Sequence, residues 1–545
     1  MQTTQQTLPG VLRAAAARYQ ENEAIVDGDV RLSYADLLER VRTAARGYVT
    51  LGLVKGDRVC IWAPNSWQWV VAALAVTYAG GVLVPVNSRY TGHEAREVIV
   101  RTSARILVMA DGFLGRDQYG ELVAAGHAQE DPFGALLTGI SNLETIIAID
   151  DTPIKHGMIE FEGLAHLGHL APGDEVERRA DDVRPDDVAD ILFTSGTTGR
   201  SKGACSMHRQ VVAVAQAWAE CGEVSSEDRY LVVNPFFHSF GYKAGIVVCL
   251  LTGATCLPQA VFDVARTIRL IESERVSVLP GAPTIYQSLL ESSQLAECDV
   301  SRLRLAVTGA ATVPVALVER MQTEMGFDTV LTAYGLTEAV VATMCRPGDD
   351  DARVANTCGR AAGGLEVCIA VPQHNDPLPP GEEGEVLLRG DNVMVGYLDD
   401  PEATGEAIDD DGWLHTGDVG RLDEDGYLKI TDRLKDVFIV GGFNVYPAEI
   451  EQVLARVDGV VESAVVGVED RRLGEVGKAF VVRRPGSSLD AETLLSYARE
   501  RLANFKIPRE ITFVADLPRN PSGKVLKREL RHHPLVEPDP PRRSQ

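Results

Sequence analysis

The sequence lacks the features that would point to a membrane, to an oxidising compartment or to a nucleic acid. Its nine cysteines form no C-x-x-C pair and are scattered from Cys60 to Cys368, which argues against a disulfide framework or a zinc site. Residues 1–20 carry no signal-peptide pattern, and the longest apolar stretch, 69–86, is interrupted by glycine and proline. The net charge of −25 argues against a nucleic-acid partner. We therefore expect a cytoplasmic protein with no integral membrane segment.

The two common phosphate-binding motifs are also missing, because neither G-x-x-x-x-G-K-[ST] nor a nearby G-x-G-x-x-G can be read. A different loop of glycines and hydroxyl residues follows the β-prone run 188–193. Its residues are Thr194, Ser195, Gly196, Thr197, Thr198, Gly199, Arg200, Ser201, Lys202 and Gly203. Small side chains leave backbone N–H groups open and the lysine adds a positive charge, so the loop predicts a polyphosphate site. A helical pattern at 211–215 predicts the order strand, loop, helix. An ordinary solvated loop is the alternative for such a run in isolation.

The length of 545 residues predicts at least two domains. Strand and helix patterns alternate as far as residue 147, which is typical of a parallel sheet covered by helices, and 113–145 is interpreted as a surface excursion. Residues 385–389 and 427–430 resemble antiparallel strands. The expected fold is α/β, with a large N-terminal α/β domain (1–434) that has parallel sheets and a β subdomain. A small C-terminal α+β domain (435–530) and a disordered tail (531–545) would follow.

The loop resembles the phosphate-binding loop of the acyl-adenylate-forming superfamily, which includes acyl-CoA synthetases, peptide-synthetase adenylation domains and firefly luciferase. The family usually reads T-S-G-T-T-G-x-P-K-G, and Ser201 stands here where proline is usual, so a fixed φ is lost while the lysine and the glycines remain. The resemblance covers nearly all of residues 10–530 through at least seven motifs in the family's order. It implies a hinge at Lys435, about which the small domain turns.

The resemblance implies catalytic roles for four residues. Glu338, which follows a β-prone run, would bind Mg²⁺, because magnesium accepts few carboxylates and completes its shell with phosphate oxygens and water. Lys524 would neutralise the two anions that meet when a carboxylate attacks the α-phosphate. Thr197 would act in the phosphate loop, and His238 would border the carboxylate site. Taken singly, each of these residues would be interpreted as an ordinary surface or core side chain.

The resemblance also implies a nucleotide and CoA site. Tyr334 would stack on adenine, Asp418 would accept both ribose hydroxyls, and Arg433 would reach ribose or phosphate. The pair Gly441 and Gly442 would line the pantetheine tunnel. The full set of implied binding residues is Thr194, Ser195, Gly196, Thr197, Thr198, Gly199, Lys202, Gly309, Ala310, Ala311, Thr332, Ala333, Tyr334, Gly335, Leu336, Thr337, Asp418, Arg433, Lys435, Gly441, Gly442 and Lys524.

The implied activity is that of an AMP-forming acyl-CoA synthetase using ATP, Mg²⁺ and CoA. Within the superfamily, segments 197–202, 234–246 and 430–458 resemble the actinobacterial CoA ligases that activate the propanoate side chain of the steroid C/D-ring remnant, a hexahydroindanedione. The alternatives are a medium-chain or aryl-acid CoA ligase and, from another class, a catalytically silent nucleotide-binding protein. The silent protein is disfavoured because Lys202, Glu338 and Lys524 are all present. A homodimer is left open.

Overall fold

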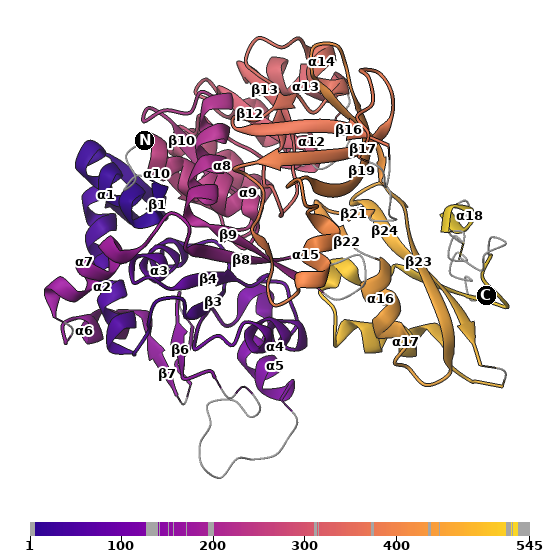
Figure 1. The fold of residues 1–545 in the computed structure, drawn as a ribbon, viewed down its shortest axis with the longest axis horizontal. Helices are drawn as coiled ribbons and strands as arrows, with labels where there is room; N and C mark the ends of the chain where they lie inside the picture. Colours follow the sequence, from indigo (N-terminus) through magenta and orange to yellow (C-terminus); the bar gives the residue numbers. More distant parts are fainter. Residues whose placement is uncertain are drawn as a thin grey trace. The chain divides into compact units, whose positions relative to one another are not determined.

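The computed structural model describes residues 6–126, 140, 142–150, 152–155, 157–170, 172–194, 201–309, 313, 315–371, 375–433, 438–445, 447–484, 486–518, 525 and 527–531. Contacts divide the chain into two units (Figure 1). The large unit comprises Met1–Thr194 and Lys202–Leu434, and the small unit comprises Lys435–Gln545 with Ser195–Ser201. Across the described ranges, no helix is both long enough and apolar enough to cross a membrane.

An eight-stranded sheet in the order β18-β9-β8-β4-β3-β5-β6-β7 is the largest of the large unit. Its strands are β3 (Arg58–Trp62), β4 (Val82–Pro85), β5 (Ile106–Met109), β6 (Thr145–Ala148), β7 (Met158–Glu160), β8 (Val188–Thr194), β9 (Lys202–Met207) and β18 (Gly396–Tyr397). The six strands β8, β4, β3, β5, β6 and β7 are parallel to one another. At the β8 edge, β9 pairs antiparallel with β8, and β18 pairs antiparallel with β9. Every residue of β4 and β5 is buried, as expected for parallel strands covered on both faces.

In the described part of the large unit there are also three four-stranded sheets, in the orders β10-β11-β1-β2, β12-β13-β14-β15 and β16-β17-β19-β20. Their strands are β1 (Glu23–Asp27), β2 (Val30–Ser33), β10 (Arg229–Val232), β11 (Thr255–Pro258), β12 (Leu305–Gly309), β13 (Thr329–Tyr334), β14 (Thr343–Met344), β15 (Arg360–Ala361), β16 (Leu365–Ala370), β17 (Gly384–Gly390), β19 (Leu414–Leu422) and β20 (Leu428–Arg433). The third sheet is antiparallel throughout and is the expected β subdomain.

The helices of the large unit follow local signals in the sequence. Ser33 and Asp36 form a capping box at the start of α2, because the side chain of each residue bonds the backbone N–H of the other. The apolar stretch 69–86 becomes the buried helix α3 followed by β4. The helices are α1 (Leu8–Tyr19), α2 (Tyr34–Thr50), α3 (Trp67–Tyr78), α4 (Gly92–Arg101), α5 (Gln118–Ala124), α6 (Phe161–Gly168), α7 (Gly173–Asp182), α8 (His208–Cys221), α9 (Ser239–Gly241), α10 (Val248–Thr252), α11 (Val264–Ser273), α12 (Pro283–Leu290), α13 (Val315–Thr323), α14 (Asp351–Asn356) and α15 (Pro401–Ala407). Shorter turns are η2 (Phe113–Gly115), the π-helical η3 (Tyr242–Val247) and η4 (Ser293–Glu297).

The stretch 113–145 differs in part from the surface excursion that the sequence predicted. Its described residues include α5, whose Leu122 is fully buried, and the first residue of β6. A single apolar side chain anchors this short helix to the domain, and one such residue gives too weak a periodic signal to be recognised in the sequence.

The small unit is an α+β domain around a five-stranded sheet in the order β22-β21-β24-β23, with β25 paired to β24. Its elements are β21 (Phe438–Val440), β22 (Phe443–Val445), α16 (Pro447–Leu454), β23 (Val460–Asp470), β24 (Gly474–Arg483), α17 (Ala491–Arg499), η5 (Asn504–Lys506), β25 (Glu510–Val514) and α18 (Lys527–Arg531). Phe438, Ile450, Val465, Val481 and Leu494 form the centre of its core. The tail 532–545 lies outside the described residues.

Candidate functional site

The loop that carries the glycines and hydroxyl residues joins two antiparallel strands, so the predicted order of strand, loop and helix was wrong. Thr194 at the end of β8 pairs with Lys202 at the start of β9, and α8 begins only at His208. Residues 202–207 pair with β8 on one side and with β18 on the other, and no local pattern announces such pairing. Phosphate at this loop would therefore meet backbone N–H groups and side chains without a helix N-terminus behind it. Ser195, Gly196, Thr197, Thr198 and Gly199 lie outside the described residues.

A chain of contacts leads from Lys202 to Glu338 through Tyr397. The Lys202 ammonium lies 4.8 Å from the centroid of the Tyr397 ring, and the Tyr397 hydroxyl donates to Glu338 Oε1 at 2.9 Å. The pairing of β18 with β9 places Tyr397 opposite Ala204, and Met394 N donates to the Glu338 carbonyl at 2.7 Å. Sequence reasoning missed Tyr397, because it stands 59 residues beyond Glu338 and its only local signal is an aromatic residue after a glycine.

The electrostatic surroundings of Glu338 combine opposing effects. Burial raises the pKa of the Glu338 carboxyl, whereas the hydrogen bond from Tyr397 and the positive charge of Lys202 lower it. The charge of Asp418 adds to the increase in this pKa, so the two carboxylates influence each other. Among the residues that the structure describes, no group of three or more His, Cys, Asp or Glu could hold a metal ion. A cation at Glu338 would therefore depend on phosphate oxygens and water for the rest of its shell.

Asp418 is presented by an irregularity in strand β19. His415 faces Leu387 and Val419 faces Glu385, so between these pairs β19 has two more residues than β17. Such a bulge leaves residues out of the ladder and turns their side chains to a new direction. Asp418 also faces the backbone of Arg433 in the pairing of β19 with β20. The register thus brings together the backbones of two residues that were predicted to meet ribose or phosphate.

A buried carboxylate on the neighbouring strand holds this bulge. Glu385 Oε1 accepts a hydrogen bond from Gly417 N at 3.2 Å, and Glu385 Oε2 lies 3.1 Å from His415 Nδ1. Gly417 has a φ of 69°, a conformation that glycine adopts without strain. On the other side, the Tyr334 hydroxyl donates to Asp418 Oδ2 at 2.7 Å. Glu385 therefore fixes the backbone before Asp418, and Tyr334 fixes its carboxylate.

The predicted adenine-binding residues lie at the ends of two adjacent parallel strands. Thr308 of β12 pairs with Thr332 of β13, and Gly309 pairs with Ala333. A Cβ atom on Gly309 would overlap the carbonyl oxygen of Ala333, so the close approach of the strands requires glycine. The buried Thr332 hydroxyl lies 2.8 Å from the Val354 carbonyl oxygen and is used inside the protein. Ala310 and Ala311 lie outside the described residues.

The turn after β13 carries Gly335, Leu336 and Thr337 towards Glu338. A Cβ on Gly335 would overlap the carbonyl oxygen of Val340, so this turn also requires glycine. Leu336 packs against the core of the β subdomain, which ties the turn to the same sheet that presents Asp418.

The segment around His238 is held by a residue that sequence reasoning missed. Asn65 Oδ1 accepts from Phe236 N at 2.7 Å, and Asn65 Nδ2 donates to the Asn234 carbonyl at 2.9 Å. His238 Nδ1 accepts from Phe240 N at 3.2 Å, which leaves the proton of the neutral ring on Nε2. Desolvation lowers the pKa of His238 to about 4, so its ring is neutral at neutral pH. A neutral ring of this tautomer can donate a hydrogen bond from Nε2–H to a carboxylate.

Two predicted residues of the small unit form a tight turn. Gly441 and Gly442 join β21 to β22 with φ values of 55° and 87°, the two positive φ angles that a two-residue hairpin of this kind needs. Gly441 N donates to the Leu473 carbonyl at 2.8 Å. Lys435 and Lys524 lie outside the described residues, and only the backbone of Arg433 is described.

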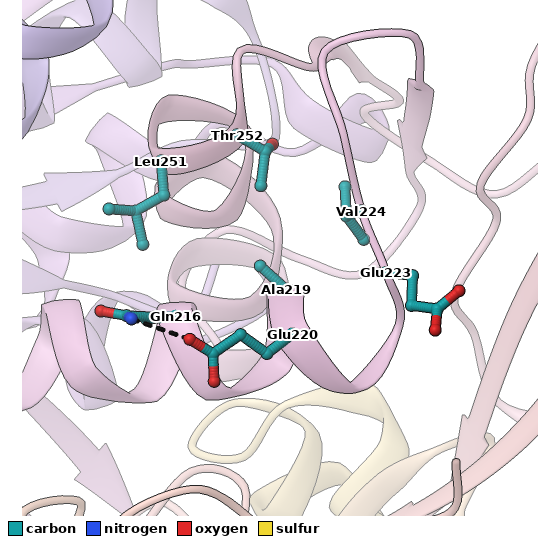
Figure 2. A pocket seen from close by; sticks show the side chains of 7 residues that line it. All are labelled: Gln216, Ala219, Glu220, Glu223, Val224, Leu251 and Thr252. Carbon is teal, nitrogen blue, oxygen red and sulfur yellow. Dashed lines mark hydrogen bonds between the residues drawn. The ribbon is translucent and has the colours of Figure 1, made fainter. Parts of the chain in front are cut away.

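The surface of the large unit also has a hollow that shares no lining residue with the predicted site. It has a volume of about 430 Å³ and is lined by residues of α8, the turn after it and α10 (Figure 2). The lining residues are Gln216, Ala219, Glu220, Glu223, Val224, Leu251 and Thr252. Gln216 donates to Glu220 across its wall at 2.8 Å. None of the predicted site residues lines this hollow.

The chain belongs to the AMP-binding enzyme family, which is a family of enzymes. The profile of that family matches residues 12–398, and the profile of the AMP-binding enzyme C-terminal domain matches residues 449–524. The chain is 53% identical over 531 residues to the 3-[(3aS,4S,7aS)-7a-methyl-1,5-dioxo-octahydro-1H-inden-4-yl]propanoyl:CoA ligase of Rhodococcus jostii, covering 96% of this chain and 98% of that protein. It is 52% identical over 526 residues to the ligase of the same name from Mycobacterium tuberculosis, with coverage of 96% and 98%. Among solved structures, the amide bond synthetase McbA of Marinactinospora thermotolerans superposes with a TM-score of 0.81 at 27% identity, covering 96% of this chain and 99% of that one.

Proposed function

We propose that this AMP-forming acyl-CoA ligase joins CoA to the propanoate side chain of a steroid-derived bicyclic diketone. Identities of 53% and 52% to two ligases named for that acid, over nearly the whole chain, support the substrate. The chain of contacts from Lys202 through Tyr397 to Glu338 is the observation that carries the nucleotide chemistry. It brings a cation and a carboxylate together at the mouth of the predicted phosphate loop.

The reaction has two steps. In the first, a carboxylate oxygen of the acid attacks the α-phosphorus of ATP, and pyrophosphate leaves with the electrons of the broken P–O bond. The product is an acyl-adenylate, a mixed anhydride with a good leaving group. In the second, the CoA sulfur attacks the acyl carbon, the thiol proton is lost and AMP leaves. The net products are acyl-CoA, AMP and pyrophosphate.

The large unit would bind the nucleotide through residues that support one another. Asp418 would accept the two ribose hydroxyls, and its bond from Tyr334 holds the carboxylate in one orientation. Tyr334 would in turn offer its ring to adenine, beside the strand ends at Gly309. Lys202 and the backbone N–H groups of the loop would meet the phosphates. Each of these groups acts by positioning and by charge, which is how most of the barrier to phosphoryl attack is lowered.

Glu338 fits Mg²⁺ by the chemistry of its donor atoms. A single carboxylate beside a polyphosphate gives a hard oxygen ligand, and the neighbouring lysine keeps the local charge balanced. When bound, Mg²⁺ would neutralise the negative charge of the phosphates. His238 would donate from Nε2 to the carboxylate of the acid and so help to admit it.

The small domain would act in both steps by turning about Lys435. In the first step Lys524 would approach the α-phosphate and offset the repulsion between the two anions. Rotation would then withdraw this lysine and present the hairpin of Gly441 and Gly442 to the pantetheine arm of CoA. A two-glycine turn offers backbone without side chains, which suits a narrow thiol channel.

A panel of acids tests the proposal. The purified protein is incubated with ATP, Mg²⁺ and one acid, with and without CoA, and AMP, pyrophosphate and acyl-CoA are measured. The panel holds the bicyclic diketone propanoate, octanoate and ferulate. We expect a kcat/KM for the bicyclic acid at least about 100-fold above that for the others, because a fitted apolar pocket discriminates at about this level. The same preparations give the oligomeric state by light scattering, which distinguishes a monomer from a homodimer.

Each alternative has its own outcome in this panel. Preference for octanoate or ferulate would replace the substrate and keep the reaction. Binding of ATP without AMP release from any acid would indicate a silent nucleotide-binding protein.

A further inference from the structure

A buried ion pair lies beneath the hairpin that carries the phosphate loop. The Lys243 ammonium lies 3.0 Å from Asp190 Oδ1 and donates to Ser206 Oγ at 2.7 Å. The side chains of Lys243 and Asp190 are 1% and 0% exposed, so both charges have left water. Burial is the main effect on the carboxyl and raises the pKa of Asp190, while the ammonium opposes the increase. Charges of this kind are costly to bury unless they are paired.

The partners of Lys243 place it between two predicted binding segments. Asp190 and Ser206 face each other across β8 and β9, and the register is regular from this pair to Thr194 and Lys202 at the loop. Because side chains alternate along a strand, all four share one face of the hairpin. The pair therefore sits on the same face as the phosphate-loop ends, about 13 Å along the strands.

Lys243 itself belongs to the segment of His238. The His238 carbonyl accepts from Tyr242 N at 3.0 Å, and the π-helical turn η3 begins at Tyr242. A π-helical turn inserts an extra residue into the helix, displaces side chains from the helical register and is frequently found at functional sites. Here it directs a lysine into the sheet. One side chain thus connects the predicted acid-binding segment with the predicted phosphate loop.

The pair is not fully satisfied. Neither Asp190 oxygen has a well-directed hydrogen bond, and the buried Tyr242 hydroxyl also has no hydrogen-bond partner among the described residues. A saturated network would hold both segments in one arrangement, whereas this one can improve its geometry if the segments shift by a fraction of an ångström. Stability alone does not explain the pair, since apolar side chains of similar volume often replace buried ion pairs without loss.

We propose that Lys243, with Asp190 and Ser206, is a positioning residue that couples binding of the acid at the His238 segment to binding of ATP at the phosphate loop. The inference rests on the proposed function, because it takes the two segments as the acid and phosphate sites. Binding of either substrate moves its segment towards the arrangement in which the ammonium bonds Asp190 well. The second substrate then meets a site that is already arranged, and the coupling is reciprocal.

The test measures this coupling without chemistry. Calorimetry gives the Kd of α,β-methylene-ATP, which cannot release pyrophosphate, with and without a saturating acid that the panel above identifies as a substrate. In the wild type, we expect a saturating acid to lower the Kd of the analogue about tenfold, which is within the usual range of coupling between two sites. In the double variant Lys243→Met with Asp190→Leu, we expect the ratio of the Kd without acid to the Kd with acid to fall to about one. The double variant replaces the pair by apolar side chains, so no buried charge is left alone to unfold the protein.

A second ion pair, in which the lysine is buried, supplies the control. Lys478 Nζ lies 2.9 Å from Glu510 Oε1 in the small unit, with the lysine side chain 2% exposed. Lys478→Met with Glu510→Leu should leave the wild-type ratio unchanged. Full coupling in the folded Lys243–Asp190 double variant would overturn the proposal, as would a wild-type ratio near one or loss of coupling in the control. If no acid in the panel yields AMP, the proposed function fails and takes this inference with it, whereas AMP release without coupling rejects this inference alone.

Discussion

His208 fastens the N-terminal helix α1 to the start of α8, directly after strand β9. The ring is 1% exposed, and its Nδ1 accepts a hydrogen bond from Leu8 N at 3.2 Å, at the start of α1. Burial is the main effect on the ring and lowers the pKa of His208 to about 4, from an ordinary value of 6.5. The nearby Asp187 raises this pKa and Lys55 lowers it further. A protonated ring could not accept from Leu8, so acid should detach this contact.

The magnitude follows from proton linkage. Because the pKa in the folded state is lower than in the unfolded state, the contribution of His208 is complete above pH 6.5 and is lost as the pH falls towards about 4. With these two pKa values, the free energy of unfolding falls by about 2 kcal/mol between neutral pH and about pH 5, which is a factor of about 30 in the unfolding equilibrium. The variant His208→Asn offers a neutral acceptor oxygen in place of Nδ1 and does not titrate.

Urea unfolding of wild type and variant at about pH 7.5 and about pH 5 measures this effect. All tryptophans of the chain lie in the large unit, so tryptophan fluorescence reports that unit alone. From about pH 7.5 to about pH 5, we expect the free energy of unfolding of His208→Asn to fall by about 2 kcal/mol less than that of the wild type. Subtracting the pH effect on the wild type from that on the variant cancels the contribution of the carboxylates, which titrate in both proteins. His169 is exposed, and His169→Asn should show no such gain. Equal pH dependence of His208→Asn and wild type would refute the buried, neutral histidine.

Three further predictions concern the two half-reactions. Lys524→Ala should lower adenylate formation by about 100-fold or more and spare thioester formation from supplied acyl-AMP, since its charge is needed only in the first step; rapid-quench assays of each step check this, and equal losses would contradict it. Glu338→Gln should raise the Mg²⁺ concentration needed for half-maximal AMP formation by about tenfold or more with little change in acid binding, and an unchanged magnesium titration would reject the assignment. Lys435→Pro fixes φ near about −65° and removes an N–H, so adenylation should survive while acyl-CoA formation collapses; if both fell together, the two-conformation account would lose its hinge.

The sequence was informative wherever a structural feature depends on neighbours in the chain. The capping box of α2 needs only Ser33 and Asp36, and α3 needs only its own run of apolar residues. The antiparallel β subdomain was expected from the strand-like runs at 385–389 and 427–430. The strand β9 was missed because its pairing partners, β8 and β18, decide that residues 202–207 are extended. A residue pattern of six positions cannot carry that information.

The same distinction applies to the candidate site, where motif residues can be proposed from the sequence but the residues that hold them in place cannot. Glu338 and Asp418 could be proposed as site residues from the sequence because they stand in ordered motifs, whereas the residues that hold them come from distant parts of the chain. Tyr397 reaches Glu338 from a strand that pairs with the phosphate hairpin, and Glu385 holds the bulge of Asp418 from across the sheet. Their roles follow from register, because a shift of one residue in β17 or β18 would turn either side chain to the opposite face. Side chains whose function depends on register should therefore be sought along the strands that neighbour a motif, since the motif itself contains no trace of them.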